Sequence, residues 1–176
     1  MNMKKYFELG MMKLLEQKNI DEITVNELVD EVGSCKGTFY KHYVDKYDLS
    51  CKCLNNSVYS KISLEVLTWE EFIYSFLKEF EKNAKVIVNA FSSNDINSAR
   101  HFCENTITDV LSKIFINADG DYDLFLNKYS LELFGITVTD IIYKWLKNGK
   151  KESKEQVMQL IKAVMPNTIY SQIYNQ

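Results

Sequence analysis

The sequence has few residues that interrupt a helix. Its 176 residues include one proline, Pro166, and six glycines, so long stretches contain nothing that breaks a helical run. The alternating apolar pattern of a half-buried strand is also missing. Apolar residues instead recur at intervals of three and four, as at Phe7, Met11 and Leu14, which is typical of an amphipathic helix. The sequence therefore predicts an all-α protein of about nine helices.

The chain also lacks several sequence motifs that are typical of enzyme active sites. It contains no glycine-rich phosphate loop, no H-E-x-x-H and no G-x-S-x-G motif. Two histidines, His42 and His101, leave little for acid–base catalysis. His101 lies near Cys103, and Cys51 near Cys53, but residues two positions apart face different sides of a helix and form no zinc-ligand pair. We expect no enzymatic activity, no metal site and no other cofactor.

Export and membrane signals are missing as well. No apolar run approaches the length needed to cross a bilayer. The opening residues MNMKKYFELGMMKLL carry Glu8 within their apolar part and no small-residue cleavage site. The four cysteines follow no disulfide framework. We therefore expect a cytoplasmic protein with reduced thiols and no membrane partner.

The chain is acidic overall, but one short segment gathers positive charge next to aromatic residues. The net charge is −3 and Arg100 is the sole arginine, which argues against general binding of polyanions. Contact with a phosphate backbone, however, depends on local clustering. Directly after Gly33, eleven positions hold three lysines, a histidine and three aromatic residues. They are Lys36, Phe39, Tyr40, Lys41, His42, Tyr43 and Lys46.

The residues around this cluster predict two short helices joined by a tight turn. Thr24 is a typical N-cap, and Glu27, three residues later, completes a capping box. Gly33 ends this helix, and a second short helix then carries residues 36–43. Two such helices form a helix-turn-helix, whose second helix can enter the major groove of DNA.

The polar residues of this segment suit contacts with DNA. Phe39 and Tyr43 can pack inward while polar neighbours face outward. Lysine can donate to guanine O6 and N7, threonine can touch a thymine methyl group, and tyrosine and histidine suit phosphate oxygens. Helix N-termini favour anions. The predicted DNA-binding residues are Thr24, Lys36, Gly37, Thr38, Tyr40, Lys41, His42 and Lys46.

The same segment resembles the DNA-binding domain of the TetR/AcrR family of bacterial transcriptional regulators. That family's pattern runs roughly T-x-x-x-I-A-x-x-A-G-V-S-x-G-T-x-Y-x-H-F-x-x-K-x-x-L, and residues 24–49 fill it without an insertion. The resemblance covers about residues 4–52. It implies contacts to bases or nearby phosphates from Lys36, Thr38 and Tyr40. It implies contacts to the DNA backbone from Thr24, His42 and Lys46.

Two positions depart from the family pattern. Ser34 stands where valine is usual, and Cys35 stands where the capping serine is usual. We expect the cap to move back to Ser34 and the recognition helix to shift slightly. Because a thiol at a helix N-terminus favours the thiolate, Cys35 is also a candidate redox switch. The alternative is that a small residue simply replaces serine.

The family resemblance implies two domains, which we place at residues 1–50 and 51–176. The first is a three-helix DNA-binding domain, and the second is a helical domain for ligand binding and dimerisation. Helices are predicted over about residues 2–17, from Lys46 to about Leu64, and over 69–90, 95–116, 122–147 and 153–165. Asn19 is expected to close the first helix in the left-handed conformation, Gly149 to close the helix over 122–147, and Pro166 to end the last helix, which begins at a capping box of Ser153 and Gln156. Residues 141–161 also resemble, more weakly, the C-terminal region of a subgroup that includes regulators of dihydroxyacetone kinase genes.

Two sets of residues in the second domain are candidates for binding. The resemblance implies a ligand cavity between helices, for which the candidates are Tyr74, Phe91, Phe102, Phe125 and Tyr129. The last two helices carry more apolar surface than one core needs, which suggests a four-helix dimer interface. Its candidates are Phe134, Val138, Ile141, Ile142, Trp145, Val157, Leu160, Ile161 and Val164. For both sets, the alternative is packing within the core of one chain.

Together these features predict a ligand-responsive transcriptional repressor that binds a palindromic DNA operator as a homodimer. Its expected partners are double-stranded DNA, a second copy of the chain and a small-molecule effector. One alternative is a helical adaptor that binds only protein and has no specific affinity for DNA. Another is a redox-responsive regulator that uses Cys35.

Overall fold

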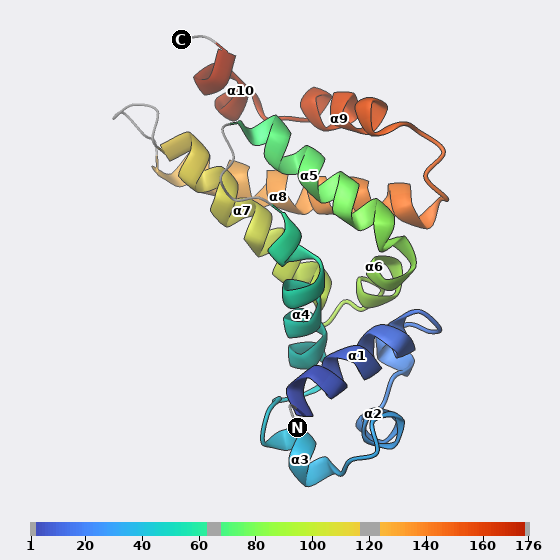
Figure 1. The fold of residues 1–176 in the computed structure, drawn as a ribbon. Coiled ribbons are helices and arrows are strands. Elements are labelled where there is room, and N and C mark those ends of the chain that lie inside the picture. Colours follow the sequence, from blue (N-terminus) through green and yellow to red (C-terminus); the bar gives the residue numbers. More distant parts are fainter. Residues whose placement is uncertain (1–2, 63–67, 117–123, 175–176) are drawn as a thin grey trace. The chain divides into compact units, whose positions relative to one another are not determined.

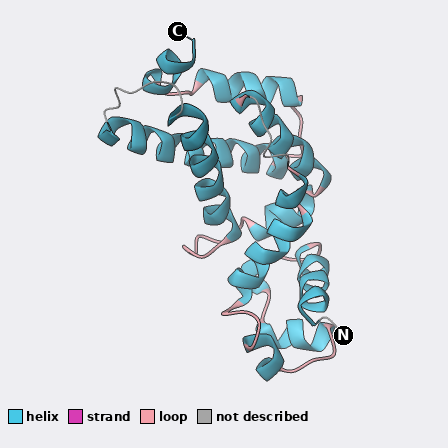
Figure 2. Cartoon of the chain, turned by 60° about the vertical axis from the view of Figure 1, so that its left-hand side comes forward, coloured by secondary structure: helices cyan, strands magenta, loops and turns pink. Residues whose placement is uncertain are grey.

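The computed structural model describes residues 3–62, 68–116 and 124–174, and every regular element in these ranges is a helix (Figures 1 and 2). The all-α prediction is confirmed. In chain order the elements are α1 (Met3–Leu15), η1 (Ile20–Glu22), α2 (Val25–Glu31), α3 (Lys36–Tyr40), α4 (Lys46–Ser57), η2 (Tyr59–Lys61), α5 (Trp69–Lys82), α6 (Ala84–Ala90), α7 (Ala99–Ile116), α8 (Leu124–Lys147), α9 (Lys154–Ala163) and α10 (Asn167–Tyr174). Within the described ranges, no helix combines the length and apolar character that a bilayer crossing requires.

Packing divides the chain into two compact units. The first comprises residues 1–62 and 79–102, and the second comprises 63–78 and 103–176. Helices α5 and α7 therefore contribute residues to both units. The predicted functional boundary at residue 50 falls within α4, inside the first unit, and it stays a prediction.

The core of the first unit is built around one aromatic residue of α1. The ring of Phe7 is fully buried and meets the rings of Phe39 and Tyr43 edge to face, with centroids 5.5 and 6.0 Å apart. Edge-to-face pairs add to the free energy gained from burial alone. Helix α1 also packs against α2, α4 and α6. It thereby holds the segment that follows Gly33 on a rigid base.

The core of the second unit is formed by apolar faces of α5, α8 and α9. Trp69 packs edge to face against Phe134, with ring centroids 6.4 Å apart. On α9, Val157 and Ile161 are buried one helical turn apart. Helix α8 contacts both α9 and α10. The long C-terminal part of the chain therefore folds around α8.

One predicted helix is divided in two by an asparagine. Residues 69–90 were expected to form a single helix, but α5 ends at Lys82 and α6 begins at Ala84. The side-chain amide of Asn83 donates to the carbonyl oxygen of Glu79 at 2.9 Å. The main-chain N–H of Asn83 instead donates to the carbonyl oxygen of Phe80 at 3.1 Å. The Asn83 side chain donates to the Glu79 carbonyl oxygen that the N–H of Asn83 would bond in a continuous helix, so the series of main-chain hydrogen bonds is interrupted there.

Three predicted helix ends also differ in the structure. Asn19 is not left-handed: it is extended (φ −64°, ψ 149°) and precedes the 3-10 helix η1. Helix α4 ends at Ser57, and the predicted end at Leu64 lies outside the described residues. Pro166 does not finish the last helix, because α10 follows it and Ile169 and Tyr170 donate to its carbonyl oxygen. Proline suits a helix start, where its missing N–H costs nothing.

Candidate nucleic-acid interface

The first helix of the predicted motif begins at the capping box expected from the sequence. The Oγ1 atom of Thr24 accepts from the N–H of Glu27 at 3.2 Å, and the Glu27 carboxylate accepts from the N–H of Thr24 at 2.9 Å. Lys18 forms an ion pair with Glu27. Hydrogen bonding from Lys18, together with the N–H of Thr24, lowers the pKa of the Glu27 carboxyl. The start of α2 is thus fixed on both sides.

The turn between α2 and α3 depends on the backbone of Gly33. Its φ of 63° lies in the left-handed region, which residues with a side chain rarely adopt. The N–H of Ser34 donates to Val29 at 2.8 Å, and that of Gly33 donates to Asp30 at 3.2 Å. This pair of bonds is the Schellman motif that closes a helix. It turns the chain so that α3 can begin three residues later.

The predicted recognition helix α3 begins at Lys36, as expected, but its cap and its end differ from the prediction. Its N-cap is Cys35, not Ser34, and the carbonyl oxygen of Cys35 accepts the N–H groups of Thr38 and Phe39 at 3.0 and 3.1 Å. The helix ends at Tyr40, and the predicted residues 41–43 follow as a turn in which the N–H of His42 donates to Phe39 at 2.9 Å. The substitution of serine by cysteine therefore leaves the cap in place.

The inner side of this segment is anchored in the core, as predicted. Phe39 is fully buried and Tyr43 is nearly so. The phenol of Tyr43 donates to the carbonyl oxygen of Lys4 at 3.2 Å. Burial raises the pKa of Tyr43 to about 12. The outward side of α3 is consequently held in a fixed orientation.

The outward side carries half of the predicted DNA-binding residues. Lys36, Gly37, Tyr40 and Lys41 are exposed, with Tyr40 at 58%. Tyr40 lies three residues after Gly37 and four after Lys36, so these three residues share one face of α3, and Lys41 directly follows the last residue of the helix. Two lysine charges and a phenol group therefore lie together on the exposed side of the segment that follows the turn at Gly33. Thr38 and His42 are half-buried at its edge.

Cys35 and Thr38 interact directly at the start of α3. The Sγ atom of Cys35 lies 3.4 Å from the Oγ1 atom of Thr38. Hydrogen bonding from the Thr38 side chain, and then from the main-chain N–H groups of Thr38 and Gly37, lowers the pKa of the Cys35 thiol. All four cysteines are free thiols, and Cys35 is exposed. The sequence predicted that Cys35 lies at a helix N-terminus, but it did not indicate the contact between Cys35 and Thr38.

Lys46 has partners within the protein that the sequence did not indicate. Its ammonium donates to the carbonyl oxygens of Asp21 and Ile23, each at 3.0 Å. The neighbouring Tyr47 donates to the carboxylate of Asp21 at 2.8 Å. Hydrogen bonds from Ser93 and Tyr47, followed by the charge of Lys46, lower the pKa of Asp21. Lys46 therefore ties the start of α4 to the chain between α1 and α2. The role of Lys46 in holding phosphate stays a prediction.

The five candidate ligand residues are divided between the two units. In the first unit, Phe91 is fully buried against Phe80, with ring centroids 5.8 Å apart, and Phe102 packs edge to face on Tyr59. In the second unit, Tyr74 is 37% exposed and Tyr129 is 51% exposed. Phe125 lies outside the residues whose side chains are described. Ligand binding by any of the five stays a prediction.

Most of the candidate dimer residues lie inside one chain. Ile141 is half-buried, whereas Leu160 on α9 and Val164, which directly follows α9, are 51% and 41% exposed. The buried ones are Phe134, Val138, Ile142, Trp145, Val157 and Ile161. Both α8 and α9 are apolar on more than one side, and a linear sequence does not show which side meets the chain's own core. All six are buried within this chain, as the alternative of packing within one core predicts, and their part in a dimer interface stays a prediction.

Comparison with known proteins shows what this arrangement is similar to. Residues 67–167 match the family model described as the transcriptional regulator C-terminal region. The match covers more than half of the chain and includes α5 to α9. It begins after the helix-turn-helix, so the family similarity of the C-terminal part is independent of the motif in residues 24–49.

Several solved structures share the fold. A TetR transcriptional regulator from Streptococcus agalactiae 2603V is similar with a TM-score of 0.66 and 20% identity, over 93% of both chains. The dihydroxyacetone kinase operon activator DhaS is similar with a TM-score of 0.62 and 14% identity, over 95% of this chain and 96% of that chain. The fatty acid degradation regulator FadR from Bacillus halodurans is similar with a TM-score of 0.60 and 11% identity, over 94% and 95%.

A curated protein also matches in sequence. An uncharacterized protein of Methanocaldococcus jannaschii is 30% identical over 109 residues, which is 62% of this chain. The chain spans about a quarter of the length of that relative, since the match covers 24% of it. The family model and the solved structures describe transcriptional regulators rather than enzymes.

Proposed function

The chain belongs to the TetR family of transcriptional regulators, and we propose that it binds a palindromic DNA operator as a homodimer. The observation that carries this proposal is the outward face of α3. Lys36, Gly37 and Tyr40 are exposed there, and Lys41 is exposed directly after them, while the buried ring of Phe39 holds the helix from the inner side. Exposed donors on a short, rigidly anchored helix are what contact with base edges in the major groove requires.

Two copies of this helix would contact the two halves of one operator. In a symmetric dimer, equivalent helices meet half-sites about 34 Å apart, one turn of DNA, or a small multiple of that distance. The palindrome then follows from the two-fold symmetry of the protein. Lys36, Thr38 and Tyr40 would touch bases or nearby phosphates. Thr24, His42 and Lys46 would hold the DNA backbone.

The exposed apolar residues of α8 and α9 support a dimer surface in the second unit. On α8, Leu133 and Ile136 are 62% and 42% exposed and lie one helical turn apart. Helix α9 packs against α8, and its Leu160 is exposed, as is Val164, which directly follows the end of α9 one turn later. Apolar side chains gathered on adjacent helices indicate an interaction surface. We place the dimer contact on these residues rather than on the six that are buried.

Sedimentation of the full chain tests this surface. We expect a dimer at micromolar concentration and a monomer after Leu160→Glu, because a dimer would bury the new carboxylate without a partner. Leu9→Glu is the matched control, since Leu9 is 58% exposed on α1 in the first unit. A wild-type monomer, or an unaffected Leu160→Glu dimer, would remove this surface from the proposal.

Regulation by a small molecule is the second part of the proposal. A ligand changes operator affinity only if it binds the DNA-competent and incompetent states differently. Support comes from the family and from Tyr74, one of the predicted ligand residues, which lines a surface groove described below. As a repressor, the protein would be released from its operator when the effector binds. A reporter gene behind the operator would then be expressed only in the presence of the effector or in the absence of the protein.

Selection from random DNA tests the DNA-binding proposal directly. The full chain should enrich sequences with two inverted half-sites, and its affinity for them should fall steeply with salt as counterions are released. The adaptor hypothesis predicts neither enrichment nor salt-dependent affinity. The redox hypothesis predicts an operator affinity that falls on oxidation in the wild type but not in Cys35→Ser.

A further inference from the structure

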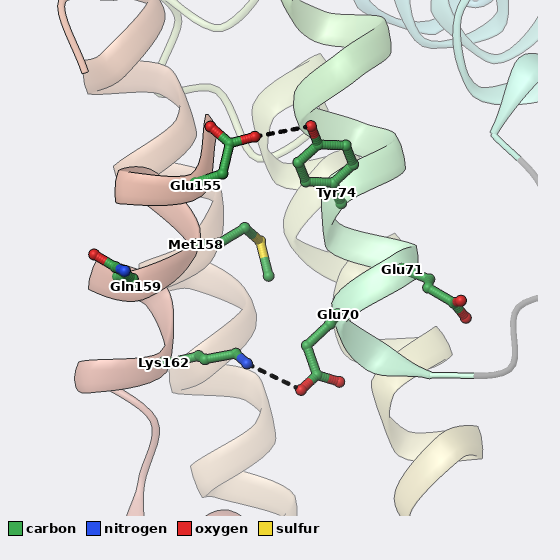
Figure 3. A pocket seen from close by; sticks show the side chains of 7 residues that line it. All are labelled: Glu70, Glu71, Tyr74, Glu155, Met158, Gln159 and Lys162. Carbon is green, nitrogen blue, oxygen red and sulfur yellow. Dashed lines mark hydrogen bonds and ion pairs between the residues drawn. The ribbon is translucent and has the colours of Figure 1, made fainter. Parts of the chain in front are cut away.

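A surface groove of about 390 Å³ lies between α5 and α9 in the second unit (Figure 3). Pockets that hold small molecules usually measure about 300 to 1,000 Å³. Tyr74 and three glutamates line it together with Met158 and Lys162. The glutamates are Glu70, Glu71 and Glu155. The groove is therefore large enough for a small organic ligand, and carboxylates dominate its charge.

Two polar contacts join α5 to α9 at opposite ends of the groove. At one end the phenol of Tyr74 donates to Oε1 of Glu155 at 3.1 Å. At the other end Lys162 pairs with Glu70, with Nζ and Oε1 3.2 Å apart. The side chain of Met158 extends into the space between these contacts (Figure 3). The groove therefore has an apolar, flexible methionine side chain between two polar ends.

The two ends differ in charge. Lys162 neutralises Glu70 and also lies over the ring of Trp69, 5.8 Å from its centroid. Glu155 instead accepts a hydrogen bond from the hydroxyl group of Tyr74. Hydrogen bonds from its own N–H, from Ser153 and from Tyr74 lower the pKa of Glu155 more than the charge of Lys154 does. Glu155 is therefore ionised at neutral pH, at the end of the groove where the ring of Tyr74 stands.

We propose that the α5–α9 groove binds an organic ammonium ion that carries a small apolar group. The cation would lie against the Glu155 carboxylate and the face of the Tyr74 ring, since aromatic faces attract cations. The apolar group would rest on Met158, whose flexible thioether adapts to irregular shapes. An organic anion would be repelled by the glutamates.

The polar contacts also favour a small ligand over a docked helix. A helical partner would need an apolar strip that continues along the groove for several turns. Here the Tyr74–Glu155 and Lys162–Glu70 contacts cross from one helix to the other and close both ends (Figure 3). The space between them suits a compact molecule.

The claim that an effector acts at this groove rests on the proposed regulatory function. The claim that the groove binds an ammonium ion does not, because binding can be measured in the absence of DNA. Binding is therefore measured without DNA, by calorimetry on the full chain with benzyltrimethylammonium as the probe. The uncharged control is 3-phenyl-1-propanol, and the anionic control is 3-phenylpropionate.

We expect the ammonium ion to bind about tenfold more tightly than the alcohol, and the anion not to bind measurably. Equal affinity for the ion and the alcohol would overturn the proposal and would indicate a groove that selects only apolar groups. No binding of the ammonium ion would also overturn it.

Variants identify the site of binding. Glu155→Gln and Tyr74→Leu should each weaken binding of the ammonium ion about fivefold, whereas Tyr74→Phe, which keeps the ring, should lose less. Asp109→Asn is the matched control, since Asp109 is an exposed carboxylate of α7 outside the groove. Circular dichroism confirms that each variant is folded. Wild-type affinity in both Glu155→Gln and Tyr74→Leu would overturn the assignment.

Operator affinity is measured on the same samples to separate the two proposals. A wild-type chain that binds its operator but not the ammonium ion would count against the groove alone. Ammonium binding by a chain without specific affinity for any DNA would count against the proposed function alone. Binding that also lowers operator affinity would identify the groove as the effector site.

Discussion

The ammonium nitrogen of Lys46 lies 3.0 Å from the carbonyl oxygen of Ile23. Ile23 directly precedes Thr24, the N-cap of α2, and Lys46 is the first residue of α4. A second bond of the same length joins Lys46 to the carbonyl oxygen of Asp21. The residue that the family resemblance assigns to the DNA backbone therefore also connects three elements of the first unit, namely η1, α2 and α4. An ammonium group has three donors, so one N–H can still reach a phosphate.

Replacing Lys46 with alanine should have two separable effects. The free energy of unfolding should fall by about 1 kcal/mol, because two hydrogen bonds from a charged donor are lost at a partly exposed site. DNA affinity should fall alike for all sequences, and the slope of log affinity against log salt should become shallower. Urea denaturation and fluorescence anisotropy measure the two effects. Lys52→Ala, which removes a lysine paired with Asp48 on the same helix, is the control. An unchanged salt slope would confine Lys46 to a structural role.

Lys36→Ala and Tyr40→Ala should reduce sequence preference rather than stability. Both side chains are exposed on α3, so their removal opens no cavity in the core. Each should cost about 1 to 3 kcal/mol of specific binding if it contacts a base edge, with a smaller loss on unrelated DNA. Competition between operator and scrambled duplexes measures this difference. Full selectivity in both variants would show that the outward face of α3 does not read the sequence.

Cys35 should be the first thiol to react with iodoacetamide. Its pKa lies below the ordinary thiol value, so at a given pH more of it is the reactive thiolate. Burial raises the pKa of Cys51 to about 11 and that of Cys53 to about 12, which keeps both protonated and shielded. Peptide mass spectrometry after brief labelling at neutral pH should find the adduct on Cys35. Bound operator should slow the reaction, and equal labelling of Cys51 and Cys53 would contradict the structure.

Gly135→Ala should destabilise the second unit. A Cβ at Gly135 would lie 2.2 Å from Oγ1 of Thr108 and 3.1 Å from the carbonyl oxygen of Glu104, so α7 and α8 would have to separate. Overpacking of this kind costs about 1 to 3 kcal/mol, which thermal unfolding can measure. Adding Thr108→Ala removes the closest atom and should restore part of the loss. A variant as stable as the wild type would show that the two helices can move apart freely.

Features set by neighbouring residues could be predicted from the sequence. The capping boxes at Thr24 and Ser153 are both present, because each is formed within a single turn. Gly33 and Gly149 both have the positive φ expected where a helix closes. The inward positions of Phe39 and Tyr43 followed from helical periodicity. Local rules failed where a side chain competed with the backbone, as when Asn83 divided the helix expected over 69–90.

The sequence by itself thus determined the all-α class, the helix-turn-helix and its outward residues, because these depend on spacing within a few turns. Tertiary structure alone decided which apolar side of α8 and α9 is core and which is exposed, because both sides satisfy the same helical pattern. It also decided the partners of Lys46 and the pairing of Tyr74 with Glu155, whose side chains meet across 81 positions of the chain. Contacts at such separations arise only when whole helices pack, and no local pattern encodes which residues will then face each other.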